Sequence, residues 1–189
     1  MNVFKLSNLI KKSPRKAFVI WRYYKEDAKI LNIGCGNLKI SSNDSYVINV
    51  DIDPSVRPDI ICDALRLPFK DDVFDIIFAF DILEHVTNPA ALISEMERVC
   101  KSNGNIVIWC LDFDVCPYNW YADKDHKYYI NELTFKILLP QYSLYRFGKD
   151  VLIAVRRPNS VDKLIFKFLE KVVNLYRIIT RCPDNRATR

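Results

Sequence analysis

Residues 30–37 read ILNIGCGN, an apolar run that leads directly into two glycines separated by one residue. A short apolar run of this kind predicts a buried strand. The glycines at its end allow a sharp turn, and they let a ligand approach the backbone where a Cβ atom would block it. This stretch therefore predicts the first strand of a sheet, with a binding crevice at the carboxyl end of that strand.

Three further apolar runs follow the glycines, and each ends in an acidic residue. They are residues 46–50 with Asp51, residues 59–62 with Asp63, and residues 74–80 with Asp81. The carboxyl ends of parallel strands meet at one edge of a sheet, so these residues are expected to converge on the glycine crevice. A carboxylate there can accept hydrogen bonds from both ribose hydroxyls, each worth about 1.5–3 kcal/mol.

The order and spacing of these pieces resemble the class I S-adenosylmethionine-dependent methyltransferases over roughly residues 28–156. The pieces are residues 32–36, 50–53, 62–64 with 67–69, and 74–75 leading to 83–86. The resemblance implies an α/β fold with a Rossmann-like, doubly wound, mostly parallel sheet of about seven strands and an antiparallel last strand. More narrowly, residues 31–37, 48–53 and 58–63 look like a methyltransferase type 11-like branch often associated with surface-polysaccharide synthesis.

The resemblance also implies S-adenosylmethionine as the cofactor. In that family the two glycines let the cofactor lie against the first loop, Asp51 binds the ribose, and Asp63 with Ala64 recognises adenine. The expected cofactor-binding residues are Asn32, Gly34, Gly36, Asp51, Ile52, Asp63, Ala64 and Phe80. Asp63 has an alternative role, in which it only caps its own loop.

The chain departs from the family pattern at three points. Asn32 stands where the family usually has an acidic residue near the methionine amino group, and Leu38 stands where a third glycine is usual. Residues 37–46 are also too few for a full crossover, which takes at least ~10–12 residues including its helix. We therefore expect a shortened first crossover helix, or a loop in its place, and a cofactor more exposed than usual.

The chain has two histidines, and both are candidate catalytic residues. His85 follows the fourth strand, near the expected position of the methyl group, where it could act as a base. His126 lies in residues 112–127, an aromatic and acidic stretch predicted to form the acceptor pocket, because aromatic faces stack on sugar rings and carboxylates bind hydroxyls. A structural role for each histidine, and simple packing for the stretch, are the alternatives. Asp81 and Asp112 are weaker candidates for the base.

The six cysteines form no CxxC pair and no cluster with histidine, so we expect reduced thiols and no metal site. The sequence also shows no signal peptide and no apolar run of the ~18–20 residues that a membrane span needs. A cytoplasmic protein is expected, with association at a membrane surface as an option.

The net charge of +5 is unevenly distributed. Residues 1–27 carry +5 and residues 156–189 carry +6, so the remainder is acidic. We expect three parts: a basic N-terminal helical segment (1–27), a methyltransferase-like catalytic domain (28–157), and a basic amphipathic C-terminal helix with its tail (158–189). The helix over 161–181 could lie on an anionic membrane surface, dock on the body, or pair two copies into a homodimer.

These observations predict an enzyme that transfers methyl groups from S-adenosylmethionine. The favoured acceptor is a hydroxyl of a small molecule or saccharide, with a lipid-linked glycan as one candidate. A nucleic-acid methyltransferase is the first alternative, but the body is acidic and lacks an Asn/Asp-Pro-Pro-Tyr/Phe motif. A non-catalytic binding protein on a decayed methyltransferase fold is the second, motivated by Asn32, Leu38 and the short first crossover.

Overall fold

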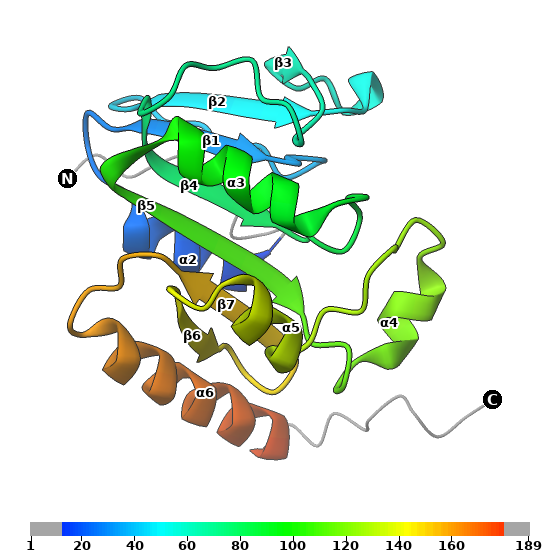
Figure 1. Ribbon diagram of the computed structural model, residues 1–189. Helices are drawn as coiled ribbons and strands as arrows, with labels where there is room; N and C mark the ends of the chain where they lie inside the picture. Colours follow the sequence, from blue (N-terminus) through cyan, green and yellow to red (C-terminus); the bar gives the residue numbers. More distant parts are fainter. Residues whose placement is uncertain (1–12, 180–189) are drawn as a thin grey trace.

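The computed structural model describes residues 13–179 and shows one twisted sheet with helices on both faces (Figure 1). The strands are β1 (Lys29–Ile33), β2 (Tyr46–Asp51), β3 (Ile60–Ile61), β4 (Phe74–Phe80), β5 (Cys100–Leu111), β6 (Ser143–Arg146) and β7 (Val151–Val155). The α-helices are α2 (Pro14–Tyr23), α3 (Pro89–Val99), α4 (Pro117–Ala122), α5 (Glu132–Leu138) and α6 (Asp162–Ile179). Residues 1–12 and 180–189, which include parts of both predicted basic ends, lie outside the described residues.

The sheet has the strand order β3-β2-β1-β4-β5-β7-β6. The first five strands pair in parallel, while β7 runs antiparallel to both β5 and β6. This confirms the mostly parallel, Rossmann-like sheet with an antiparallel hairpin at its end. The order turns back between β1 and β4, and open α/β sheets bind ligands beyond the carboxyl ends of strands at such a point.

The first crossover is shortened as predicted, because residues 34–45 contain no helix. Two asparagine side chains satisfy the backbone of this loop instead. The Asn49 amide accepts from Ile40 N at 2.8 Å and donates to Ile40 O at 3.0 Å. Asn32 Nδ2 donates to Leu38 O at 2.9 Å. The next crossover holds only a 3-10 turn, η1 (Pro54–Val56).

Each face of the sheet carries its own apolar core. Helices α3 and α5 cover one face, with Met96 and Phe135 among the buried side chains. Helices α2 and α6 cover the other, with Ile20 and Phe166 buried there. Figure 1 shows α3 and α2 on opposite sides of the strands. The central strands β1, β4 and β7 are almost wholly buried between these layers, which explains their nearly continuous apolar sequence, whereas β2, β3 and β6 are partly exposed.

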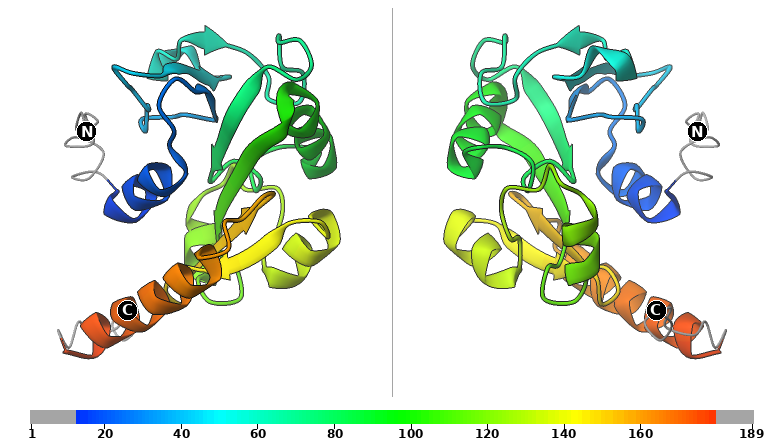
Figure 2. Two further views of the ribbon diagram at one scale, coloured as in Figure 1. Left: turned by 90° about the vertical axis from the view of Figure 1, so that its left-hand side faces the viewer. Right: turned by 90° about the vertical axis from the view of Figure 1, so that its right-hand side faces the viewer.

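The start of α6 docks on the body through a buried carboxylate. Asp162 is 0% exposed, and it accepts hydrogen bonds from Tyr23 Oη at 2.8 Å and Asn159 N at 2.6 Å. Arg22 of α2 adds an ion pair at 2.5 Å. One turn later Phe166 stacks on Tyr145, with ring centroids 4.8 Å apart. Figure 2 shows the rest of α6 projecting beyond the sheet.

The acidic and aromatic stretch 112–127 is more ordered than its sequence suggested. It includes the six-residue helix α4, which Pro117 begins at its first turn. A helix of this length is too short to show a periodic pattern. None of the helices in residues 13–179 combines the length and the apolar character needed to cross a bilayer.

Candidate functional site

The glycine loop after β1 forms the floor of the crevice. Gly34 and Gly36 have φ of +62° and +45°, in the left-handed region that favours glycine. A Cβ on Gly34 would lie 2.6 Å from Ile82 Cδ1, so this glycine is needed for close packing. A Cβ on Gly36 would meet nothing within 4 Å. Gly36 therefore faces open space at the carboxyl end of the sheet.

Two cavities of about 430 and 440 Å³ open on either side of this loop. Both are lined by Gly34, Gly36 and Asp81, so the two cavities lie next to each other and are together called the crevice. Their volumes are in the range of small-molecule sites. Helix α2 contributes Ser13 and Lys16 to the first cavity and so covers one side of it.

All eight predicted cofactor residues line this crevice. Asn32, Gly34, Gly36 and Phe80 line the first cavity, and Gly34, Gly36, Asp51, Ile52, Asp63 and Ala64 line the second. His85 also lines the second cavity, whereas His126 does not line either one. The sequence spacing thus brought together residues from four strand ends, as the parallel topology requires.

Three of these side chains also hold the local backbone. Asp51 accepts from Gly36 N at 2.7 Å and from Asp53 N at 3.0 Å, which fixes the glycine loop against β2. Asp63 accepts from Leu65 N at 2.9 Å, so it has the loop-capping contact as well as a place in the crevice. Asn32 is 1% exposed, and its Nδ2 also donates to Asn49 Oδ1 at 3.0 Å.

Asp81 lies where the two cavities meet. Its backbone is in the left-handed region, with φ of 50°, and its N–H donates to Trp109 O at 2.8 Å. Its Oδ2 pairs with the ammonium of Lys16 from α2. Its Oδ1 is buried and has no hydrogen-bond partner within residues 13–179. Strained backbone of this kind is commonly concentrated at functional sites.

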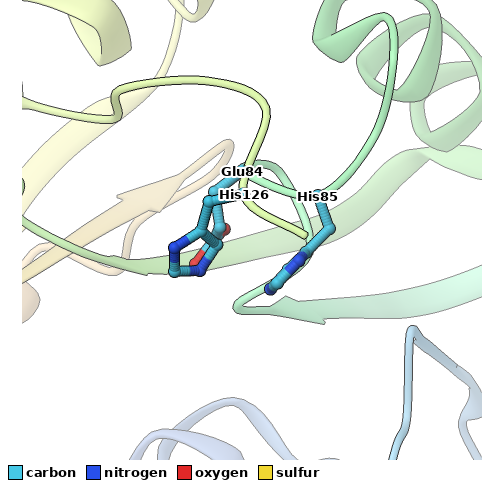
Figure 3. A group of neighbouring side chains, drawn as sticks. All are labelled: Glu84, His85 and His126. Atoms are coloured by element: carbon cyan, nitrogen blue, oxygen red, sulfur yellow. The ribbon is translucent and has the colours of Figure 1, made fainter. Parts of the chain in front are cut away.

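Glu84, His85 and His126 form a cluster at the edge of the second cavity (Figure 3). The two imidazole centroids lie 4.6 Å apart. Glu84 is 6% exposed; burial raises the pKa of its carboxyl to about 7, and the Asp81 charge contributes to this rise. Burial lowers the pKa of His85, and the neighbouring His126 lowers it further. Both effects favour the neutral form of the His85 imidazole.

The sequence identified both histidines but not their proximity, and it missed Glu84. The chain turns back after α4, and the N–H groups of Lys127 and Tyr128 donate to Glu84 O at 2.8 and 3.3 Å. Tyr128 Oη also donates to Thr87 O at 2.9 Å. These contacts bring His126 beside His85. The only sequence signal for Glu84 was its place next to His85 at the end of β4.

Asp112, the other candidate for a base, is placed for a structural role. It is 1% exposed and pairs with Arg146 at 2.8 Å. Its backbone carbonyl accepts from Cys116 N at 2.9 Å, which organises the turn after β5. Asp112 lines neither cavity, so it does not face the crevice.

Comparison with known proteins identifies the class of domain to which this crevice is similar. Residues 31–108 match the Methyltransferase domain family. An uncharacterised protein of Methanocaldococcus jannaschii is 32% identical over an alignment of 105 residues, which covers 51% of this chain and 51% of that protein. The chain spans about half the length of the curated relatives it matches first.

Two solved structures share the fold. The PH0226 protein of Pyrococcus horikoshii has a TM-score of 0.61 at 17% identity and aligns over 84% of this chain and 93% of its own. A SAM-dependent methyltransferase of Methanosarcina mazei has a TM-score of 0.56 at 19% identity, over 72% of this chain and 95% of its own. At these identities the likeness concerns the fold alone.

Proposed function

We propose that this chain, whose residues 31–108 form a class I S-adenosylmethionine-dependent methyltransferase domain, methylates a hydroxyl group of a small molecule or saccharide. One observation carries the proposal. The eight residues that the family resemblance assigns to the cofactor all line the two adjacent cavities of the crevice. The histidine cluster lies at the edge of the same crevice, where an acceptor can reach it.

The crevice fits the cofactor that the domain implies. Gly36 leaves open the space in which a Cβ would stand, and Asp51 lines the same cavity at the end of β2. Asp51 is half-buried and keeps lone pairs beyond its two backbone contacts, so it can accept from ribose hydroxyls. S-adenosylmethionine supplies an electrophilic methyl group when bound. The protein has only to position the acceptor and handle its proton.

Two features favour a hydroxyl of a saccharide as the acceptor. A hydroxyl must lose its proton, and the neutral His85 imidazole in the cavity wall can accept one. Beyond the cluster, Tyr118 and Tyr121 of α4 are 80% and 66% exposed. Exposed aromatic faces are the surfaces on which sugar rings stack.

The test is transfer of a labelled methyl group from S-adenosylmethionine to a panel of acceptors. The panel holds free saccharides, a lipid-linked saccharide, a phenol and an RNA. We expect label in a saccharide, and we expect His85→Asn to lower the rate by about 100-fold or more, because proton removal contributes roughly 10²–10⁴-fold. Labelling of the RNA alone would instead favour the nucleic-acid alternative.

We further propose that α6 lies on an anionic lipid surface. Lys163, Lys167 and Lys171 are exposed along one stripe of the helix. The adjacent stripe exposes Leu164 and Phe168, which are 71% and 63% exposed. A cationic stripe beside an apolar one is typical of helices that lie in a membrane interface.

The double substitution L164S/F168S is expected to abolish flotation of the protein with anionic vesicles. The buried Phe166 stays in place, so the fold is retained. The matched control is L133S/I137S, which removes two equally exposed apolar side chains from α5 and should float normally. Equal flotation of both variants would contradict the assignment of α6. Failure of the unaltered protein to bind the vesicles would exclude a lipid surface.

A further inference from the structure

We propose that Glu84, His85 and His126 bind a divalent transition-metal ion, and that this ion holds the acceptor hydroxyl for methyl transfer. The site has three ligand groups that come from two separate segments, the loop between β4 and α3 and the loop after α4. The acceptor part of the proposal rests on the methyltransferase function proposed above. The metal site itself rests on the geometry and chemistry of the three side chains. It departs from the sequence-based expectation of no metal site.

The three side chains are close enough to share one ion. One ligand atom from each, an imidazole nitrogen or a carboxylate oxygen, lies within 4.8 Å of the other two. Ligands about 2.1 Å from a common ion stand roughly 3–3.5 Å apart, so side-chain rotations of about 1 Å complete the site. Figure 3 shows the three side chains, with Glu84 and His126 overlapping in this view and the His85 ring turned toward them. Two imidazoles and one carboxylate suit zinc, manganese or iron better than magnesium.

Glu84 is buried without an ion-pair partner within residues 13–179, so its carboxyl is favoured in the neutral form unless a positive charge binds beside it. Its carboxylate is nearly fully buried, and the thiol of Cys110, 3.3 Å away, is its hydrogen-bond donor. No lysine or arginine in residues 13–179 forms an ion pair with Glu84, since Lys16 pairs with Asp81. A buried charge is costly unless it is paired or coordinates a metal. A bound cation would supply this partner.

The ligands are already oriented by backbone contacts. The backbone of Asp125 lies beside the His85 ring, in position for the second contact that metal-binding histidines commonly make. The two hydrogen bonds from residues 127 and 128 to Glu84 O hold His126 against the same strand end. The site is therefore built from both sides before any ion binds.

Three protein ligands leave at least one position of the ion open. His85 lines the cavity that contains Asp51 and Gly36, so the open position faces the cofactor crevice. An acceptor hydroxyl takes that position, and coordination lowers the pKa of the hydroxyl. In the transfer an O–C bond forms as the S–C bond breaks. The S–C electron pair stays on sulfur, giving S-adenosylhomocysteine, and the hydroxyl proton passes to water. With the ion bound, His85 is a ligand, so metal coordination replaces the direct proton transfer to His85 proposed above.

The test uses the full chain, stripped with EDTA and dialysed, then titrated with Zn²⁺, Co²⁺ or Mg²⁺ in a calorimeter. We expect one Zn²⁺ or Co²⁺ per chain at micromolar affinity or tighter, with Mg²⁺ weaker. Glu84→Gln and His126→Asn should each weaken Zn²⁺ at least about 100-fold, because even second-shell losses cost 10–100-fold. Asp125→Asn is the matched control in the same loop; it keeps the backbone carbonyl and should bind Zn²⁺ within about threefold.

Equal Zn²⁺ affinity in Glu84→Gln, His126→Asn and the unaltered chain would overturn the site, as would the absence of binding below millimolar. If the Glu84→Gln variant does not fold, the His126→Asn variant alone tests the metal site, because His126 lies in a surface loop and its substitution should not disturb the fold. S-adenosylhomocysteine is titrated into every sample. If the chain binds S-adenosylhomocysteine but no metal, the proposed metal site is wrong and the proposed methyltransferase function stands. If it binds metal but no S-adenosylhomocysteine, the methyltransferase function is wrong and the metal site stands. Activity lost in EDTA and restored by Zn²⁺ or Co²⁺ supports the acceptor role; activity unchanged in EDTA overturns it.

Discussion

Asp51→Ala is expected to weaken binding of S-adenosylhomocysteine by roughly 100-fold or more, as measured by isothermal titration calorimetry, because hydrogen bonds from two ribose hydroxyls are lost. Each hydrogen bond from a ribose hydroxyl to the carboxylate contributes about 1.5–3 kcal/mol. The substitution also removes the 2.7 Å contact to Gly36 N that holds the glycine loop against β2. Both losses act on the same cavity, so the effect on the cofactor should exceed the effect on stability.

The matched control is Asp53→Ala, two residues further along the chain. Asp53 caps η1 by accepting from Ser55 N at 2.8 Å and lines neither cavity. Its loss should change the affinity less than about threefold. Asp51→Asn keeps the shape and one acceptor oxygen, and it should fall between the two. An unchanged affinity in Asp51→Ala would show that the ribose assignment is wrong.

Asp162→Ala is expected to lower the free energy of unfolding by about 3–5 kcal/mol, because removing one partner of a buried ion pair leaves the other charge uncompensated. Asp162 is 0% exposed, and the Arg22 side chain 2.5 Å away is 17% exposed. The substitution also removes the acceptor for Tyr23 Oη and Asn159 N. Urea unfolding followed by circular dichroism measures the change.

The Asp162→Asn variant separates the contribution of the ion pair with Arg22 from that of the accepted hydrogen bonds. The amide oxygen can still accept one of these hydrogen bonds, but the charge opposite Arg22 is lost, so a smaller decrease is expected. A loss under about 1 kcal/mol in Asp162→Ala would contradict the docking of α6 on α2. Because α2 also supplies Lys16 to the crevice, the alanine variant should weaken cofactor binding as well.

The sequence predicted the crevice well because its residues are fixed by local pattern. Each parallel strand is an apolar run, and the residue at its end can occupy only one edge of the sheet. Asp51 and Asp63 were therefore placed by the ends of residues 46–50 and 59–62 alone. The missing first helix followed equally from counting residues 37–46. A connection of this length between two parallel strands has little room for a helix.

The acceptor side could not be predicted in the same way. His126 reaches His85 because two backbone N–H groups after α4 bond to Glu84 O, and backbone contacts between loops leave no trace in side-chain pattern. Glu84 looked like an ordinary polar residue after a strand, and its burial depends on that loop covering it. The pairing of Asp162 with Arg22 likewise depends on how α6 returns to α2. Long-range closure of this kind is set by tertiary packing.

The central claim, that the crevice between β1, β2 and β4 holds S-adenosylmethionine, is tested most directly by titrating the purified chain with S-adenosylhomocysteine and with S-adenosylmethionine in a calorimeter. We predict binding of one molecule per chain at micromolar affinity for at least one of the two. The absence of binding to a chain that circular dichroism shows to be folded would contradict the claim and favour a non-catalytic protein on a methyltransferase fold.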